Sequence, residues 1–228
     1  MLRPGLLDGV GMLLAGPAPP RSGGESLGDA VAGACTALEA QLATCAAPAG
    51  DSHEHLEAAS DGAVRNALAE IGRIGVLVID AASVLAAGPA GSAEDGSAAG
   101  PPEARSPAAA AEALGDCLQA VWTLTRSVFN LSFLPAQEGG RVLYLAPREG
   151  DGTHARAALA GLENLSRTLS IEWARHGVTA VTIAPGRLTA AGEVAALAAY
   201  LASPAGAYFS GCLLDLRGPG GSAAHPAK

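Results

Sequence analysis

Few residues of this chain combine a reactive type with a spacing that suits catalysis. Asp151 and His154 lie three positions apart in a polar stretch and could act as a general acid/base pair. Arg148 and Glu149 carry charge in the same stretch. The other interpretation is an exposed polar loop without a catalytic role, because surface loops commonly carry polar side chains.

Metal ligands are expected to be absent. His53 and His55 flank Glu54, but two positions that are two residues apart on a helix point to different faces. The cysteines show no Cys-x-x-Cys spacing and no histidine at a ligand spacing, so we expect them to be small, buried, apolar side chains. These cysteines are Cys35, Cys45, Cys117 and Cys212.

Nucleophilic catalysis by serine or tyrosine finds little support in the pattern. Ser83, Ser166 and Ser170 are not part of a Gly-x-Ser-x-Gly turn, which argues against a hydrolase. Tyr144 falls inside an apolar run of strand length, where a packed core residue is the expected role.

Composition and charge restrict the class of protein. The net charge of −8 and the single lysine, Lys228, argue against nucleic-acid binding, which needs clustered basic side chains. No apolar run reaches the roughly 18 residues of a membrane-spanning helix, and Arg3, Pro4 and Asp8 make a poor signal peptide. We expect a cytoplasmic protein whose core is rich in alanine, since 49% of the residues are hydrophobic but only 4% are aromatic.

The order of apolar patterns predicts an α/β fold with a doubly wound parallel sheet of the Rossmann type. Buried-strand patterns alternate with helical ones along the chain. The expected strands are residues 10–15, 75–80, 141–145, 178–183 and 212–216, and the expected helices are residues 27–42, 63–71, 111–134, 159–173 and 193–201.

Three segments are too poor in large apolar side chains to order themselves. Residues 17–24 are rich in Pro and Gly, residues 86–107 are a low-complexity insert, and residues 219–228 form a polar tail. The expected organisation is therefore one domain over residues 1–218, interrupted by a flexible insert at about 86–107, with a flexible tail at 219–228.

The segment LAGLENLSRTLSIEWARHGVTAVTIAPG, residues 159–186, resembles the later part of the short-chain dehydrogenase/reductase family. It has that family's long helix, glycine turn, buried strand and Ala-Pro-Gly ending. EVAALAAYLASPAGAYFSGCLLDLRG, residues 193–218, resembles the family's closing helix, loop and last strand. The resemblance extends over nearly the whole chain and implies the same fold.

The family's Tyr-x-x-x-Lys pair is missing. In relatives the tyrosine is the proton donor, and the lysine lowers its pKa and holds the nicotinamide ribose. Counting back from Gly186 places the lysine at Leu159 and the tyrosine at Ala155. Shifting the frame places them at Arg156 and Gly152, so neither frame supplies a phenol.

The family's other catalytic positions are also replaced. The catalytic serine at the end of a strand corresponds to Ala146 or Pro147, and the asparagine of the central helix falls near Cys117. Only residues 187–192 separate the Pro-Gly turn from the next helix, so little of the substrate lid is left and we expect hardly any pocket there.

The family's Thr-Gly-x-x-x-Gly-x-Gly loop, whose backbone N–H groups hold the pyrophosphate, is altered. The remnant glycines are Gly16, Gly23, Gly24 and Gly28. Prolines at 17, 19 and 20 remove amide donors and fix φ. Residues 79–82 replace the family's Asn-Asn-Ala-Gly, and the interval from residue 28 to residue 80 is too short for a full cofactor half. We expect no tight binding of NAD(H) or NADP(H).

Two functions follow from the resemblance. The first is a non-catalytic subunit, a pseudoenzyme that assembles with an active short-chain dehydrogenase or with itself. The alternative is an NAD(P)-dependent oxidoreductase acting on a carbonyl or alcohol with a relocated donor; a small-molecule sensor is a third option. Relatives pair their long central helices, and the corresponding interface residues here are Trp122, Phe129, Leu169 and Trp173.

Overall fold

The computed structural model describes residues 2–16, 26–48, 52–87, 107–151 and 154–218. The segments predicted to be flexible, 17–24, nearly all of 86–107 and 219–228, lie outside these ranges. Gly23, Gly24 and Gly152 also lie outside them.

The described strands form one parallel sheet in the order β2-β1-β3-β4-β5-β6. This arrangement confirms the predicted α/β class and the doubly wound parallel sheet. The strands are β1 Gly11–Ala15, β2 Gln41–Cys45, β3 Val76–Asp80, β4 Gly140–Leu145, β5 Val178–Pro185 and β6 Cys212–Leu216.

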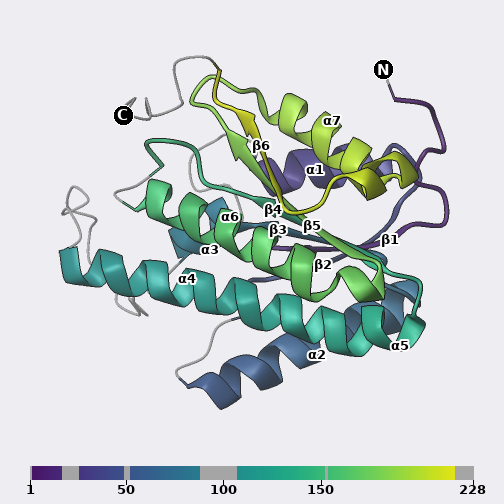
Figure 1. Ribbon diagram of the computed structural model, residues 1–228, viewed down its shortest axis with the longest axis horizontal. Coiled ribbons are helices and arrows are strands. Elements are labelled where there is room, and N and C mark those ends of the chain that lie inside the picture. Colours follow the sequence, from purple (N-terminus) through teal and green to yellow (C-terminus); the bar gives the residue numbers. More distant parts are fainter. Residues whose placement is uncertain (1, 17–25, 49–51, 88–106, 152–153, 219–228) are drawn as a thin grey trace, which may run out of the picture.

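Helices cover both faces of the sheet, with α1 and α7 on one side and α2, α4 and α6 on the other (Figure 1). The alternation of strand side chains explains why both faces need a cover: Leu13 and Ala15 enter one core, whereas Met12 and Leu14 enter the other. The helices are α1 Leu27–Thr36, α2 His53–Ile71, α3 Ala81–Ala87, α4 Pro107–Val128, α5 Leu134–Ala136, α6 Ala155–Glu172 and α7 Ala191–Ala202.

Local signals set the start and the end of the helices beside β1. The Ser26 hydroxyl accepts a hydrogen bond from the N–H of Asp29 at 3.0 Å and so caps α1. Ser52 caps α2 in the same way through the N–H of His55. Gly72 ends α2 with a φ of +73°, a left-handed conformation that glycine adopts at little cost.

The predicted helix over residues 27–42 is wrong in its second half. Helix α1 ends at Thr36, Glu39 turns the chain with a φ of +74°, and Gln41 begins the edge strand β2. Gln41 and Thr44 are exposed, so this edge strand lacks the continuous apolar run of an inner strand. The sequence pattern of the strand therefore could not be told apart from that of the helix before it.

The half of the sheet beyond β1 is short, as the sequence predicts. Only one strand, β2, lies beyond β1 among the described residues, and α2 then leads directly to β3. The classic Rossmann order 3-2-1-4-5-6 has two strands there. One strand-helix unit is therefore missing from the half that would hold the adenosine of a dinucleotide.

Candidate functional site

The carboxyl ends of β1 and β3 lie at the switch point of the sheet, where doubly wound folds bind their ligands. Gly16 follows β1 there with a φ of +90°. A Cβ at this position would lie 2.9 Å from the carbonyl oxygen of Asp80 and 3.1 Å from the side chain of Val84. Gly16 thus lets the two strand ends approach closely.

The buried carboxylate of Asp80 occupies this switch point. Its Oδ2 accepts hydrogen bonds from the Gly28 N–H at 2.9 Å and from the Ser83 hydroxyl at 2.8 Å, and its Oδ1 accepts one from the Ser83 N–H at 3.1 Å. Burial raises the pKa of Asp80, and hydrogen bonds from Ser83, Gly28 and Ala82 lower it again. Because all of these partners donate, the geometry suits the ionised, acceptor-only carboxylate.

The N-terminus of α1, the place where a dinucleotide fold holds its pyrophosphate, already faces this carboxylate. Gly28 is the second residue of α1, and a Cβ on it would lie only 3.0 Å from Asp80 Oδ2. Asp29 brings a second carboxylate to the first turn, where its Oδ2 accepts a hydrogen bond from Ser26 at 2.7 Å. The positive end of the helix dipole is thus neutralised from within the chain, and another anion would be repelled.

The described residues that follow β2 directly, 46–48, offer no partner for the adenosine ribose. Dinucleotide folds place an acidic or arginine side chain after the second strand, where it recognises the 2′ position of the ribose. Here Cys45 ends β2 and is followed by Ala46, Ala47 and Pro48. Together with the Asp80 carboxylate at α1, this means that the described residues do not fit NAD(H) or NADP(H).

The positions of the family's catalytic residues hold side chains without suitable chemistry. Ala146, Pro147, Ala155 and Leu159 are all buried. Arg156 is exposed and pairs with Glu149. None of these described positions carries a proton donor for a carbonyl substrate.

Cys117, at the position of the family's asparagine, is also buried. Its Sγ lies 3.8 Å from the carbonyl oxygen of Ala81, and burial raises the pKa of this thiol to about 12. Burial likewise raises the pKa of Cys35 to about 12 and that of Cys45 to about 11. These thiols stay protonated at neutral pH and are poor nucleophiles.

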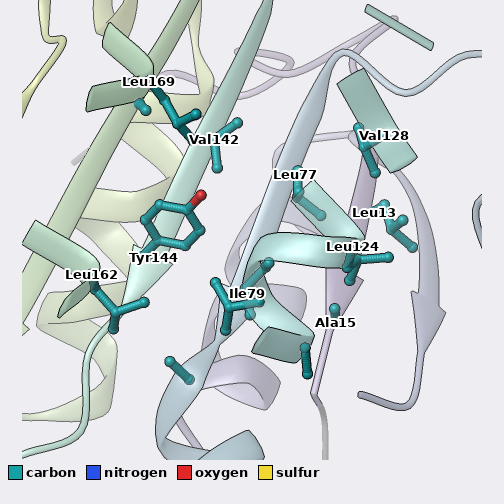
Figure 2. Packing of buried hydrophobic residues seen from close by; sticks show 14 of the residues in the cluster. Leu13, Ala15, Leu77, Ile79, Leu124, Val128, Val142, Tyr144, Leu162 and Leu169 are labelled. Carbon is teal, nitrogen blue, oxygen red and sulfur yellow. The ribbon is translucent and has the colours of Figure 1, made fainter. Parts of the chain in front are cut away.

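Tyr144 is confirmed as a core residue. Its ring lies among Val142, Leu162 and Leu169 (Figure 2). The buried hydroxyl lies 3.1 Å from Thr125 Oγ1, and burial raises the pKa of the phenol. Tyr144 therefore cannot deliver a proton to a ligand at the edge of the sheet.

The loop after β4 does not assemble an acid/base pair. Asp151 Oδ2 accepts a hydrogen bond from the Arg148 N–H at 2.8 Å, and among the described residues no hydrogen bond joins Asp151 to His154. Arg148 in turn donates to the Thr189 carbonyl oxygen at 3.0 Å. His154 precedes α6, and its Nε2 is buried without a hydrogen-bond partner.

The expectation that hardly any pocket is left beyond β5 is wrong. An open hollow of about 600 Å³ lies at the carboxyl ends of β5 and β6, between Glu149, Leu188 and Arg217. Leu188, in the short connection after β5, lines this hollow and is 98% exposed. Arg217 is held there by Asp215, with 2.6 Å between Nη2 and Oδ2.

The histidines that flank Glu54 have other partners. His53 Nε2 lies 3.0 Å from Glu57 Oε1 one turn along α2, and its Nδ1 lies 3.3 Å from Gln119 Nε2. Within the ranges that the structure describes, no group of three or more His, Cys, Asp or Glu side chains could hold a metal ion.

Three of the four residues expected at an interface stack on one another inside the chain, and Leu169 belongs to the same core cluster. The rings of Phe129 and Trp173 stack with centroids 4.1 Å apart, and Trp122 stacks on Trp173 at 6.4 Å. Phe129, Leu169 and Trp173 are buried, whereas Trp122 is half-buried. Of the four, only Trp122 offers appreciable surface to another subunit.

Sequence reasoning treated Asp80 only as a replaced motif residue and missed its contacts. A signal was present, since an acidic residue that ends an otherwise apolar strand, VLVID, must find donors when it is buried. The partner could not be read from the sequence, because Gly28 lies 52 residues away in the chain.

The sheet order, the helices on both faces and the closing helix and strand define the fold of short-chain dehydrogenases. The chain is similar to the citronellol catabolism dehydrogenase of Pseudomonas aeruginosa, with 24% identity and a TM-score of 0.67, over 95% of this chain and 96% of that one. A short-chain dehydrogenase from Mycobacterium smegmatis matches with 21% identity and a TM-score of 0.68, over 93% of each chain.

A third similar structure is the 3-ketoacyl-(acyl-carrier-protein) reductase of Brucella melitensis, solved with NADH. It shares 20% identity and a TM-score of 0.68 over 93% of this chain and 98% of that one. No model of a known protein family matches the sequence, and no curated protein does either. None of the described helices is long and apolar enough to cross a membrane.

Proposed function

We propose that this chain is a non-catalytic subunit with the short-chain dehydrogenase fold, which assembles with an active dehydrogenase of that fold. The observation that carries the proposal is the Asp80 carboxylate bonded to Gly28 at the N-terminus of α1. An enzyme of this class must bind both a hydride carrier and a proton donor in the right geometry. Here an internal anion takes the place of the carrier's pyrophosphate.

The carboxyl edge of the sheet supports the same conclusion. The described positions of the family's tyrosine and serine hold Ala155, Ala146 and Pro147, whose side chains carry no ionisable proton. Without a proton donor and a site for the hydride carrier, the chain cannot reduce a carbonyl, but the packing of the fold stays intact.

A half-buried apolar strip on α4 and α6 supports the assembly part of the proposal. Leu118, Trp122 and Leu165 pack against the core but keep part of their surface exposed. Apolar side chains at the centre of a contact, with aromatic anchors among them, are typical of stable subunit interfaces.

Copurification tests the assembly directly. A tagged form of the full chain, isolated with its untagged cellular neighbours, is expected to carry an active dehydrogenase of the same fold in a fixed ratio. The Trp122→Asp variant should lose that partner and show a smaller particle mass in light scattering, because a charge would be buried at the contact. Leu188→Asp, which alters a fully exposed apolar residue elsewhere, is the matched control and should keep the partner.

An unchanged particle mass for Trp122→Asp, in the presence of the partner, would rule out this interface. Circular dichroism of both variants separates a lost contact from a lost fold. A purified wild-type chain that reduces carbonyls by itself would rule out the non-catalytic role.

His154 supports a second candidate function, an NAD(P)-dependent oxidoreductase with a relocated donor. Its Nε2 is buried and unpartnered just before α6, beside the positions where relatives place their catalytic tyrosine. Under this alternative, steady carbonyl reduction by the purified chain would fall by about two orders of magnitude in His154→Gln. Turnover that is equal in both proteins, or absent from both, would remove the alternative.

A further inference from the structure

The amino ends of the strands enclose a second cavity, on the edge of the sheet opposite to Asp80. It has a volume of about 280 Å³, and it lies where β1, β2 and β4 begin and where the chain enters β3 and β5. Arg73, Arg141, Gln41, Thr179 and Glu138 contribute polar side chains to its lining. Two arginines therefore line the same cavity, and the charge of Arg73 acts on Arg141.

Arg141 has a fixed backbone position in β4 but no counterion among the described residues. It is the second residue of β4, and its backbone is in register with Val76 on β3 and with Thr179 on β5. Its Nε is buried without a hydrogen-bond partner, and among the described residues no carboxylate lies within ion-pair distance of its guanidinium. A buried polar group of this kind is costly unless something binds to it.

Arg73 adds a second positive charge to the same cavity. It lies in the turn between α2 and β3, and its Nη1 is 2.5 Å from Glu138 Oε2. Glu138 therefore pairs with Arg73, and no described carboxylate pairs with Arg141. Burial lowers the pKa of Arg141, and the charge of Arg73 lowers it further, as expected where positive charge is in excess.

Glycines keep the cavity walls in place. A Cβ on Gly11 would collide with the carbonyl oxygen of Arg73, and a Cβ on Gly139 would collide with the carbonyl oxygen of Gly177. The backbone segments are thus packed against each other directly. This packing fixes the backbone from which the two arginines extend, which lowers the entropy cost of binding a ligand.

We propose that this cavity is a binding site for a small oxyanion, a phosphate or carboxylate group, held by the guanidinium groups of Arg73 and Arg141. The planar guanidinium presents paired N–H donors that match the oxygens of either group. The bound anion would balance the positive charge of Arg141, which Glu138 leaves unpaired because it pairs with Arg73. The proposed site is separate from the switch point beside Asp80, because it lies at the amino ends of the strands.

Thermal unfolding of the full chain at pH 7 tests the site, with inorganic phosphate and acetate as separate probes and chloride at equal ionic strength as the reference. We expect a saturable rise of Tm with at least one of the two oxyanions, because a ligand that binds only the folded state stabilises it. The more effective probe identifies the ligand class as phosphate-like or carboxylate-like.

Substitutions separate binding at Arg141 from general salt effects. Arg141→Met should raise the half-saturating concentration of the effective anion by about tenfold or more, and Arg141→Lys by a smaller factor. Arg65→Met, which removes an exposed arginine paired with Asp61 on α2, is the matched control and should leave it unchanged. In chloride alone, Arg141→Met should not lower Tm, because it removes an unpaired, desolvated charge.

A further measurement needs no variant that might fail to fold. In the wild-type protein, the ¹⁵N–¹H resonance of Arg141 Nε should shift on titration with the effective anion. The absence of any saturable effect of both anions, or equal responses of the wild type and Arg141→Met, would overturn the proposal. A lower Tm of Arg141→Met in chloride would overturn it as well, because the arginine would then serve packing alone.

Discussion

The Asp80 carboxylate accepts a hydrogen bond from the Gly28 N–H at 2.9 Å, and a Cβ on Gly28 would lie 3.0 Å from the same carboxylate oxygen. Gly28 thus lets the side chain of Asp80 approach the N-terminus of α1 closely, and each end of this contact can be tested.

Replacing Asp80 by alanine should destabilise the fold. The substitution leaves the Gly28 N–H and the two Ser83 donors without their acceptor, and unsatisfied donors of this kind cost about 1–3 kcal/mol in the free energy of unfolding. Urea denaturation followed by circular dichroism measures the change. Asp8→Ala, at an exposed carboxylate near the N-terminus, is the control and should change the free energy of unfolding by less than about 0.5 kcal/mol.

Asp80 should also contribute to the way the free energy of unfolding changes with pH. Burial raises its pKa in the folded state above the ordinary value of 3.8, so the folded chain holds more protons than the unfolded chain between these two pKa values. The free energy of unfolding must therefore fall as pH rises through that interval and level off above the folded-state pKa. Asp80→Asn lacks this group and should not show this part of the fall.

Urea unfolding of both proteins at several values from about pH 4 to about pH 8 gives the comparison. Carboxylates other than Asp80 affect both proteins equally, so the difference between the two curves isolates Asp80. Parallel curves over the whole range would show that the pKa of Asp80 is the same in the folded and unfolded states.

The Tyr144 hydroxyl should matter for stability and not for any reaction. Thr125 donates to the Val121 carbonyl oxygen at 2.7 Å, which leaves the Tyr144 hydroxyl to donate to Thr125. Tyr144→Phe removes this buried hydrogen bond and should cost about 1 kcal/mol in the free energy of unfolding. Tyr208→Phe alters a 92% exposed ring and should be neutral; equal effects of the two substitutions would contradict the placement of Tyr144 in the core.

The inner part of the fold could be predicted from sequence patterns, and the edge could not. Inner strands such as Val76–Asp80 are buried on both faces and therefore read as unbroken apolar runs. The edge strand Gln41–Cys45 has one open side, and its mixed pattern merged with the end of α1. Helix α2 was predicted too short, because its first turns are polar and only the Ser52 cap marks where they begin.

From the sequence, the candidate site could be predicted only as the absence of the family's catalytic and cofactor-binding residues. Replacement of a motif is visible in the sequence, whereas the contact between Asp80 and Gly28 depends on β1 and β3 lying side by side. The placement of Arg73 and Arg141 in the lining of one cavity depends in the same way on the order of the strands. Long-range contacts of this kind carry no local signature.

Calorimetric titration of the purified full chain with NADH and with NADPH tests the central claim most directly. Because Asp80 and Asp29 already neutralise the N-terminus of α1, we expect no saturable heat with either dinucleotide up to about millimolar concentration, where binding is worth only about 4 kcal/mol. A saturable heat with micromolar affinity for either dinucleotide would contradict the account, because it would require a phosphate site where the structure places the carboxylate of Asp80.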